Sequence, residues 1–243
     1  MTFLESERLS FEDTLQQTWR IYKLKFTKFI LVSLTFRGPY YIIFVYLYKF
    51  TFLTQLGKRR LDSLFFVFFL IETIAFIVIT NKTLQNENDN TGYIQSLKTG
   101  WSLLWKLITT NFLAGGIIIL GLLLLVIPGI ALLGYYQFTT YIVVLRQKKN
   151  MDAIRYSKDI VTDQWWKLFG YWLGIWIVIG LPSWILYFLN KHLFGSISFA
   201  FIYGFLYTIL SYPFSYVFHT ILFLKFEALY QQNHQEVLQT EGA

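Results

Sequence analysis

The chain contains no cysteine and few charged residues, and both absences restrict what it can be. Without cysteine it can form no disulfide bond, and it offers no thiolate to a metal ion or to a substrate. Only 14% of its 243 residues are charged, whereas a soluble domain usually carries about 25%. Instead, 55% of the residues are hydrophobic and 21% are aromatic. This composition is typical of an integral membrane protein.

Six apolar runs approach or exceed the length needed to cross a hydrocarbon core of about 30 Å. We therefore expect an all-α, polytopic membrane protein with a single domain over residues 1–226. The six predicted transmembrane helices are Phe26–Phe50, Leu64–Thr80, Ile108–Ile127, Ile130–Leu145, Leu168–Leu189 and Phe199–Leu224. Residues 227–243 are polar and rich in glutamine, so we expect them to extend the last helix briefly and then to fray as a cytoplasmic tail.

Most of the 21 lysine and arginine residues flank the apolar runs on the side of both chain termini. The positive-inside rule therefore places both termini in the cytoplasm, in a multi-pass protein of the cell (inner or plasma) membrane. The basic cluster in residues 56–62 opposes this assignment locally. The first ten residues have neither a basic n-region nor an apolar h-region, so we expect the N-terminus to be retained. Because the basic residues flank membrane runs, the net charge of +7 indicates topology, and no nucleic-acid partner is expected.

An amphipathic stretch that ends in tryptophan precedes each of three membrane hairpins. The stretches begin near Ser10, Thr91 and Asn150, which suggests a threefold repeat of a helix plus a hairpin. The corresponding units span about 10–80, 91–146 and 150–226. Each helix would lie in the membrane interface and contact lipids, and packing against the bundle is the equal alternative. The predicted interfacial anchors are Phe11, Leu15, Trp19, Trp101, Trp105, Trp165 and Trp166.

Pro128 and Gly129 interrupt a long apolar run, and this dipeptide is typical of the two central positions of a type II turn. We expect the turn to separate the third span from the fourth. A re-entrant loop that lines a pore is the alternative. In the fifth span, Gly170 and Gly174 are spaced for close helix approach, to which we assign no function.

Arg37 and Glu72 are the only basic and the only acidic residue deep within the predicted spans. At about 1.5 Å per residue they lie about 16 Å and about 14 Å from the cytoplasmic ends of their helices, and thus at similar depth. We predict that they form an ion pair across the first hairpin. Pairing would relieve the cost of about 2.5 to 3.5 kcal/mol that each charge alone carries in a membrane. We interpret the pair as structural, with a role in a transport path as the alternative.

Residues that could perform catalysis or hold a metal ion are scarce. The three histidines, His192, His219 and His234, fall in an outer loop, in the last span and in the tail. No HExxH, GxSxG or phosphate-loop pattern occurs. We therefore expect no catalytic residue, no metal site and no cofactor. His219 is interpreted as a hydrogen-bonded core residue.

Residues 126–172 combine a Pro-Gly hairpin, a span, a short basic loop, an amphipathic helix and an aromatic-basic return to the membrane. The residues that carry this pattern are Pro128, Gly129, Ala153, Ile154, Ser157, Trp166, Lys167 and Phe169. On these residues the chain resembles the membrane domain attached to some glycerophosphodiester phosphodiesterases and the related YciC-like bacterial inner-membrane proteins. The resemblance implies the membrane fold alone, because the phosphodiesterase activity belongs to a separate soluble domain.

These observations predict a non-enzymatic membrane accessory or envelope-maintenance protein that contacts lipids and a protein partner. The alternative is a small transporter, or an export or immunity factor, with a polar path near Arg37 and Glu72. A cavity that connects this pair to a membrane surface would favour transport, whereas tight packing around it would favour the accessory role. The sequence leaves the ligand, the partner and the oligomeric state open.

Overall fold

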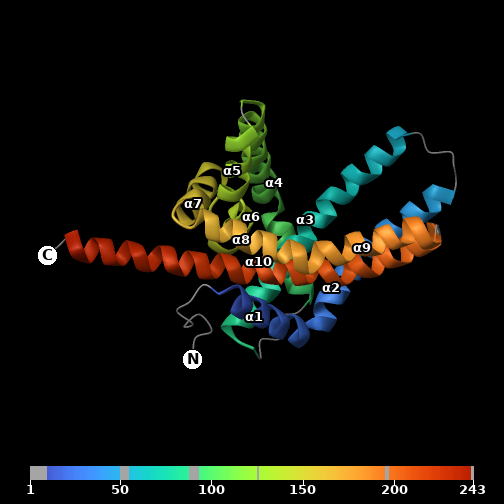
Figure 1. The fold of residues 1–243 in the computed structure, drawn as a ribbon, viewed down its shortest axis with the longest axis horizontal. Helices are drawn as coiled ribbons and strands as arrows, with labels where there is room; N and C mark the ends of the chain where they lie inside the picture. The colour runs from blue at the N-terminus through green and yellow to red at the C-terminus, as the bar shows by residue number, and fades with distance from the viewer. Residues whose placement is uncertain (1–9, 50–54, 88–92, 125, 195–196, 242–243) are drawn as a thin grey trace.

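The computed structural model describes residues 10–49, 55–87, 93–124, 126–194 and 197–241, and nearly all of this part of the chain is helical (Figure 1). The helices are α1 (Phe11–Leu24), α2 (Phe26–Lys49), α3 (Gln55–Gln85), α4 (Tyr93–Leu124), α5 (Val126–Tyr135), α6 (Thr139–Arg146), α7 (Asn150–Thr162), α8 (Trp165–Ile175), α9 (Leu181–Leu189) and α10 (Ile197–Glu241). Two π-helical turns, η1 (Trp176–Gly180) and η2 (Asn190–Phe194), flank α9. The predicted all-α class is confirmed.

Within the described residues, five helical stretches are long and apolar enough to cross a membrane. They are Phe68–Gln85, Ile94–Leu124, Pro128–Arg146, Trp165–His192 and Ile202–Gln235. These stretches are consistent with a multi-pass membrane protein. The first predicted span forms the continuous helix α2 but is not among the five, so the sixth span stays a prediction.

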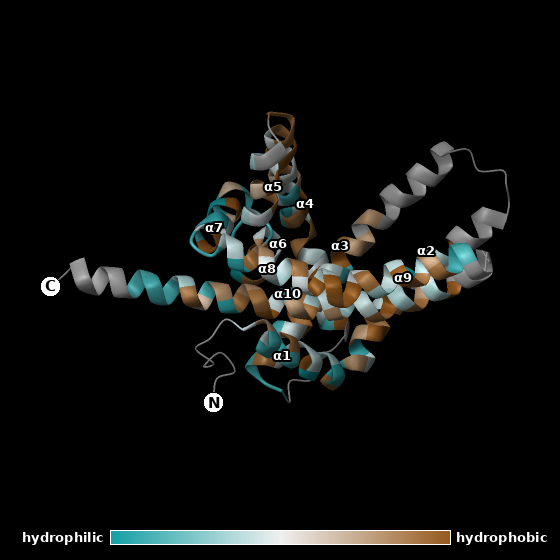
Figure 2. Ribbon diagram, in the orientation of Figure 1, coloured by the Kyte–Doolittle hydropathy of each residue, from teal (hydrophilic) through white to brown (hydrophobic). Residues whose placement is uncertain are grey.

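The core lies where α3 and α10 pack together, with α2, α6 and α7 around them (Figure 1). Aromatic rings fill much of it: Phe76 of α3 lies between Phe29 of α2 and Tyr216 of α10. The Phe138 ring packs against two rings of α10, Phe223 and Phe226, with 5.6 Å between the ring centres in each pair. Figure 2 shows hydrophobic residues along the α4–α5 hairpin and the middle of α10, and hydrophilic residues in α7 and toward the C-terminal end of α10.

The α4–α5 hairpin is built differently from the predicted one. Because α5 begins at Val126, Pro128 and Gly129 lie in its first turn and are not the central residues of a bend. Proline is tolerated there, since the first N–H groups of a helix have no partner within it. A Cβ atom on Gly129 would lie 2.4 Å from the Leu122 side chain. The glycine therefore permits α4 and α5 to pack closely.

One predicted boundary is wrong. The second amphipathic stretch forms no separate helix, because α4 continues without a break from Tyr93 to Leu124. The fourth predicted span lies within the candidate stretch Pro128–Arg146, which contains a turn at residues 136–138 between α5 and α6. Ser157 of α7 donates to the Tyr135 carbonyl at this turn, at 2.7 Å, and so satisfies a group that the end of α5 leaves free. The threefold repeat stays a prediction, since its second unit lacks a separate first helix.

The C-terminal segment is helical over a longer stretch than predicted. α10 continues to Glu241, whereas the sequence suggested fraying soon after residue 227. Glu227 is buried, and the Tyr230 ring lies edge-on to Tyr156 of α7. These contacts with α7 support the helix as far as Tyr230, because packing contributes more to helix stability than local propensity does. Residues 231–235, which follow, are exposed.

Candidate functional site

Arg37 of α2 and Glu72 of α3 form an ion pair inside the bundle, as predicted from their equal depth. Arg37 Nε donates to Glu72 Oε1 at 2.8 Å, and the two side chains are 7% and 1% exposed. The guanidinium lies over two rings, with its carbon 3.8 Å from the centre of Tyr212 and 5.0 Å from that of Phe69. Residues of α2, α3 and α10 therefore enclose the pair.

Further polar groups lie close to this ion pair. Thr73, the neighbour of Glu72, donates to the Tyr216 hydroxyl at 2.9 Å. The second carboxylate oxygen, Glu72 Oε2, and the Ser33 hydroxyl are buried without a hydrogen-bond partner among the residues that the structure describes. A buried oxygen without a hydrogen-bond donor is costly. In a transport role, Glu72 Oε2 would accept a hydrogen bond from the transported molecule or from water.

A second buried carboxylate, Glu227 of α10, lies where α6, α7 and α10 meet. Arg146 donates to its two oxygens at 2.7 and 2.5 Å, and the Tyr156 hydroxyl donates to Oε1 at 3.0 Å. Burial, together with the adjacent Glu227 carboxylate, raises the pKa of Tyr156. Lys148 Nζ lies 3.5 Å from the centre of the Tyr156 ring. The sequence alone does not indicate this cluster, because Glu227 directly follows the last apolar run and is expected to lie in the tail.

Polar contacts dock α1 along α10. Lys225 Nζ donates to Asp13 Oδ2 at 2.6 Å, although the lysine side chain is only 7% exposed. The Tyr22 hydroxyl donates to the Leu210 carbonyl at 3.0 Å, and burial raises the pKa of Tyr22 to about 12. The first amphipathic helix therefore packs against the other helices. Its sequence is equally compatible with this packing and with a position in the membrane interface.

The predicted interfacial anchors fall into two groups. Phe11 and Leu15 pack against the protein core, and a Cβ atom on Gly174 would lie 2.6 Å from the Phe11 ring. Trp165 also faces inward, with its Nε1 donating to the Ala131 carbonyl at 3.2 Å. These three side chains contact protein, so their predicted role as lipid anchors is corrected. The anchors that are more than half exposed are Trp19, Trp101, Trp105 and Trp166.

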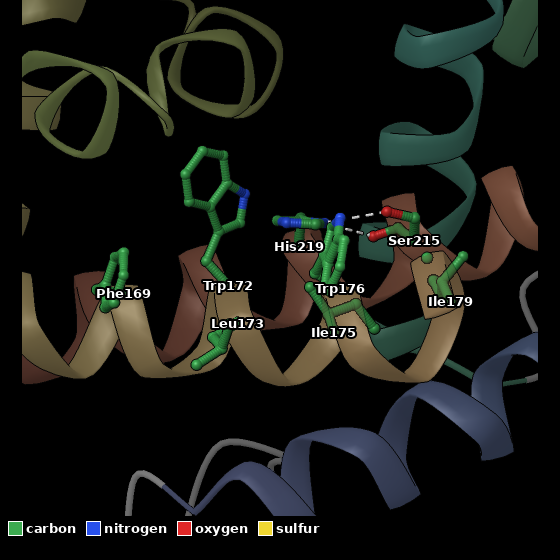
Figure 3. Close-up of a pocket in the computed structure, with 9 residues that line it drawn as sticks. Phe169, Trp172, Leu173, Ile175, Trp176, Ile179, Ser215 and His219 are labelled. Carbon is green, nitrogen blue, oxygen red and sulfur yellow. Dashed lines mark hydrogen bonds between the residues drawn. The ribbon is translucent and has the colours of Figure 1, made fainter. Parts of the chain in front are cut away.

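Two of the cavities beside α8 have neither Arg37 nor Glu72 in their lining. One, of about 540 Å³, lies between the α8–η1 segment and α10 and includes Trp172, Trp176 and His219 in its lining (Figure 3). The other, of about 570 Å³, lies between α5 and the turn that joins α7 to α8. Within the described part of the chain, no three His, Asp or Glu residues are grouped so that they could hold a metal ion.

In its described residues the protein is multi-helical, with five stretches long and apolar enough to cross a membrane. The Arg37–Glu72, Arg146–Glu227 and Lys225–Asp13 pairs each join two helices. Residues 54–232 match a family model described as a domain of unknown function, DUF7847, and this match covers most of the chain. The chain therefore belongs to that family. No curated protein and no solved structure matches the chain. Because α1 and α2 precede the matched residues, the Arg37–Glu72 and Asp13–Lys225 pairs each join a helix outside the matched region to one within it.

Proposed function

We propose that the protein is a non-enzymatic accessory protein of the cell membrane, which acts through contact with lipids and with a partner protein. The observation that carries the proposal is the enclosure of the Arg37–Glu72 pair. A transport path needs water or substrate to reach its ionisable groups. Both side chains are less than a tenth exposed, and Tyr212 covers the guanidinium. This environment supports a structural role for the pair.

Contact with lipid is supported by exposed tryptophan residues that have lysine neighbours. Trp101 and Trp105 lie four residues apart on one face of α4, close to Lys106, and Trp166 precedes Lys167 at the start of α8. Tryptophan favours the headgroup region, and lysine is attracted to anionic lipid. We therefore place the N-terminal ends of α4 and α8 at the same membrane surface.

We place both termini at this surface, on the cytoplasmic side. α1 is joined to the C-terminal half of α10 by Asp13 and Lys225, and Arg20 of α1 pairs with Glu87, which follows α3, at 2.7 Å. If α2 is counted as a span, the chain crosses the membrane six times and returns to the side on which it starts. Most of the basic residues then face the cytoplasm, in agreement with the positive-inside rule.

A partner protein is supported by the α4–α5 hairpin, which projects from the rest of the helices (Figure 1). Leu120, Leu123 and Leu124 near its end are all strongly exposed. A helix of another membrane protein could pack along this surface and replace lipid there. The resemblance to the YciC-like inner-membrane proteins belongs to the same proposal, since it too points to a membrane component.

The competing proposal is a small transporter that uses the unpaired Glu72 Oε2. The absence of cysteine permits a direct test, because a single introduced cysteine can be labelled without background. We would compare Ser33→Cys, beside the ion pair, with Ser102→Cys on the exposed face of α4. Each variant would be treated in native membranes with a small, membrane-impermeant thiol reagent, before and after denaturation.

The accessory role predicts that Ser102→Cys reacts in the native protein and that Ser33→Cys reacts only after denaturation. Reaction of native Ser33→Cys from either side of the membrane would show a water path to the pair. That result would overturn the proposal in favour of transport. Reagent applied to one side at a time would also report the side on which residue 102 lies, and so test the orientation.

A further inference from the structure

The cavity between the α8–η1 segment and α10 has one histidine in an otherwise largely apolar wall. Figure 3 shows His219 pointing from α10 toward the other segment, where it lies between Trp172 and Trp176. None of the nine residues that line this cavity is charged. Its two polar side chains are His219 and Ser215, one helical turn apart on α10.

The hydrogen bonds of His219 determine what its free nitrogen can do. Nδ1 lies 2.7 Å from the Ser215 carbonyl oxygen and 3.4 Å from Ser215 Oγ. A carbonyl oxygen only accepts hydrogen bonds, so Nδ1 carries the proton and donates it. A charged imidazole would be costly among these apolar side chains, and the ring is therefore neutral. Nε2 then has a free lone pair, and the cavity offers a hydrogen-bond acceptor.

The depth of this acceptor limits the kind of molecule that can reach it. His219 precedes Lys225 by six residues on α10, and Trp172 follows Lys167 by five residues on α8. At about 1.5 Å per residue, the cavity lies about 8 to 9 Å below these lysines. That level corresponds to the upper part of the acyl chains, just below the headgroups. A phosphate or an ammonium group would lose its hydration there, whereas a hydroxyl group with an acceptor would not be penalised.

The π-helical turn η1 forms part of the cavity wall, and α10 holds it in place. Such turns are rare in helices and occur frequently at functional sites. Tyr207 of α10 donates to the Ile179 carbonyl within η1. A Cβ atom on Gly180 would lie 3.1 Å from Trp176 Nε1, so the glycine leaves room for the indole at the edge of the cavity. The wall is thus a fixed part of the fold.

We propose that this cavity binds a membrane lipid with a small, uncharged head that bears a free hydroxyl group, of the diacylglycerol type. The hydroxyl donates to His219 Nε2, and an acyl chain lies against Trp172 and Trp176. The inference rests on the proposed lipid contact and assigns it a specific site. Phospholipids surround the protein but cannot bring a charged headgroup to Nε2.

The test uses the purified full chain in phosphatidylcholine nanodiscs and a photoactivatable diacylglycerol with a free hydroxyl. The matched probe is the same molecule with that hydroxyl acetylated. We expect the free-hydroxyl probe to label peptides of α8, η1 and α10 about 3- to 10-fold more than the acetylated probe, which is the range of one hydrogen bond. Unlabelled dioleoylglycerol should compete with it. Equal labelling by the two probes would overturn the inference.

Variants locate the effect at the cavity. His219→Phe should abolish the preference for the free hydroxyl, whereas His219→Gln, which keeps an acceptor, should retain part of it. Trp176→Ala should reduce labelling by both probes. Trp184→Ala should not, although the two tryptophans are 60% and 61% exposed on the same helical segment. An unchanged preference in folded His219→Phe protein would contradict the site.

The possible failures can be told apart. If a phospholipid probe labels the spans but the two diacylglycerol probes label alike, the hydroxyl site is wrong and lipid contact stands. If Ser33→Cys reacts in the native membrane, the accessory role is wrong whatever the probes show. The comparison of the two probes on the unmodified chain decides the inference even if His219→Phe fails to fold.

Discussion

Of the five candidate spans in the described part of the chain, the two most apolar are the two least buried. In the most apolar 18 residues of each stretch, the buried share is 22% for Ile94–Leu124 and 6% for Trp165–His192. The corresponding share is 61% for both Phe68–Gln85 and Ile202–Gln235. In a soluble protein the order is the reverse, because apolar residues concentrate inside. In a bilayer the outer surface has to be apolar, whereas the interior can hold polar groups that are paired.

The polar residues of α3 and α10 illustrate this difference. Glu72 and Glu227 are each paired with an arginine from another helix. The hydroxyls of Thr80 and Thr220 donate to carbonyl oxygens one turn earlier in their own helices. By contrast, α9 has no buried residue. We call α2, α3 and α10 the inner bundle, and the α4–α5 and α8–α9 segments the outer hairpins.

The largest effect should come from removing one charge of the inner bundle. Arg37→Leu or Glu72→Leu leaves the other charge buried without its partner, and each should lower the free energy of unfolding by about 3 to 5 kcal/mol. The double variant should lose less than either single one. Folded yield and thermal unfolding in a mild detergent would measure this. Equal, additive losses would show that the two residues do not stabilise each other.

Glu227→Ala should have the next largest effect. It removes both Arg146 contacts and the Tyr156 hydrogen bond, but Arg146 is partly exposed and can find water. We expect a loss of about 2 to 3 kcal/mol. The control is Glu87→Ala, whose pair with Arg20 lies nearer the surface and should contribute less than about 1 kcal/mol. Similar losses at the two sites would contradict the burial of Glu227.

A matched pair of glycines on α8 tests the docking of α1. Gly174→Leu would collide with Phe11, whereas Gly170→Leu has nothing within 4 Å of the added Cβ atom. We expect the first variant to lose about 1 to 2 kcal/mol and the second almost nothing. Amide hydrogen exchange in α1 should become faster only in Gly174→Leu. Faster exchange in both variants would indicate a general loss of structure and no specific contact.

The smallest expected effect comes from comparing one Phe→Leu substitution in the inner bundle with one in the outer hairpins. Phe76→Leu changes a fully buried ring of α3, and Phe112→Leu changes a strongly exposed ring of α4. We expect about 1 kcal/mol for the first and less than about 0.5 kcal/mol for the second. Thermal unfolding of both variants under the same conditions would measure the difference. The reverse order would mean that α4 packs against protein.

Features that depend only on the type of a residue and on its depth in the membrane can be predicted from the sequence. The Arg37–Glu72 pair can be predicted in this way, because two charges at the same depth in a membrane have few other partners. The helical class followed in the same way from the long apolar runs. Boundaries were less predictable, since the tryptophan-rich start of α4 looked like a separate helix and no residue between Tyr93 and Leu124 ends it.

The contacts between helices could not be predicted, because they depend on which faces meet. Phe11 has the same periodicity whether it faces lipid or fits beside Gly174. Glu227 likewise has the same polarity in a frayed tail as in a pair with Arg146. The Pro128–Gly129 pair was recognised as part of a hairpin, but its position within α5 depends on the packing against Leu122.

One measurement tests the division between the inner bundle and the outer hairpins most directly. The protein would be reconstituted in bilayers that contain phosphatidylcholine with a diazirine in its acyl chain, irradiated, and mapped by peptide mass spectrometry. The account predicts adducts concentrated in Ile94–Leu124 and Trp165–His192 and few in Phe68–Gln85, since the exposed faces of the first two contact lipid. Adducts spread evenly over the three stretches, or concentrated in Phe68–Gln85, would contradict it.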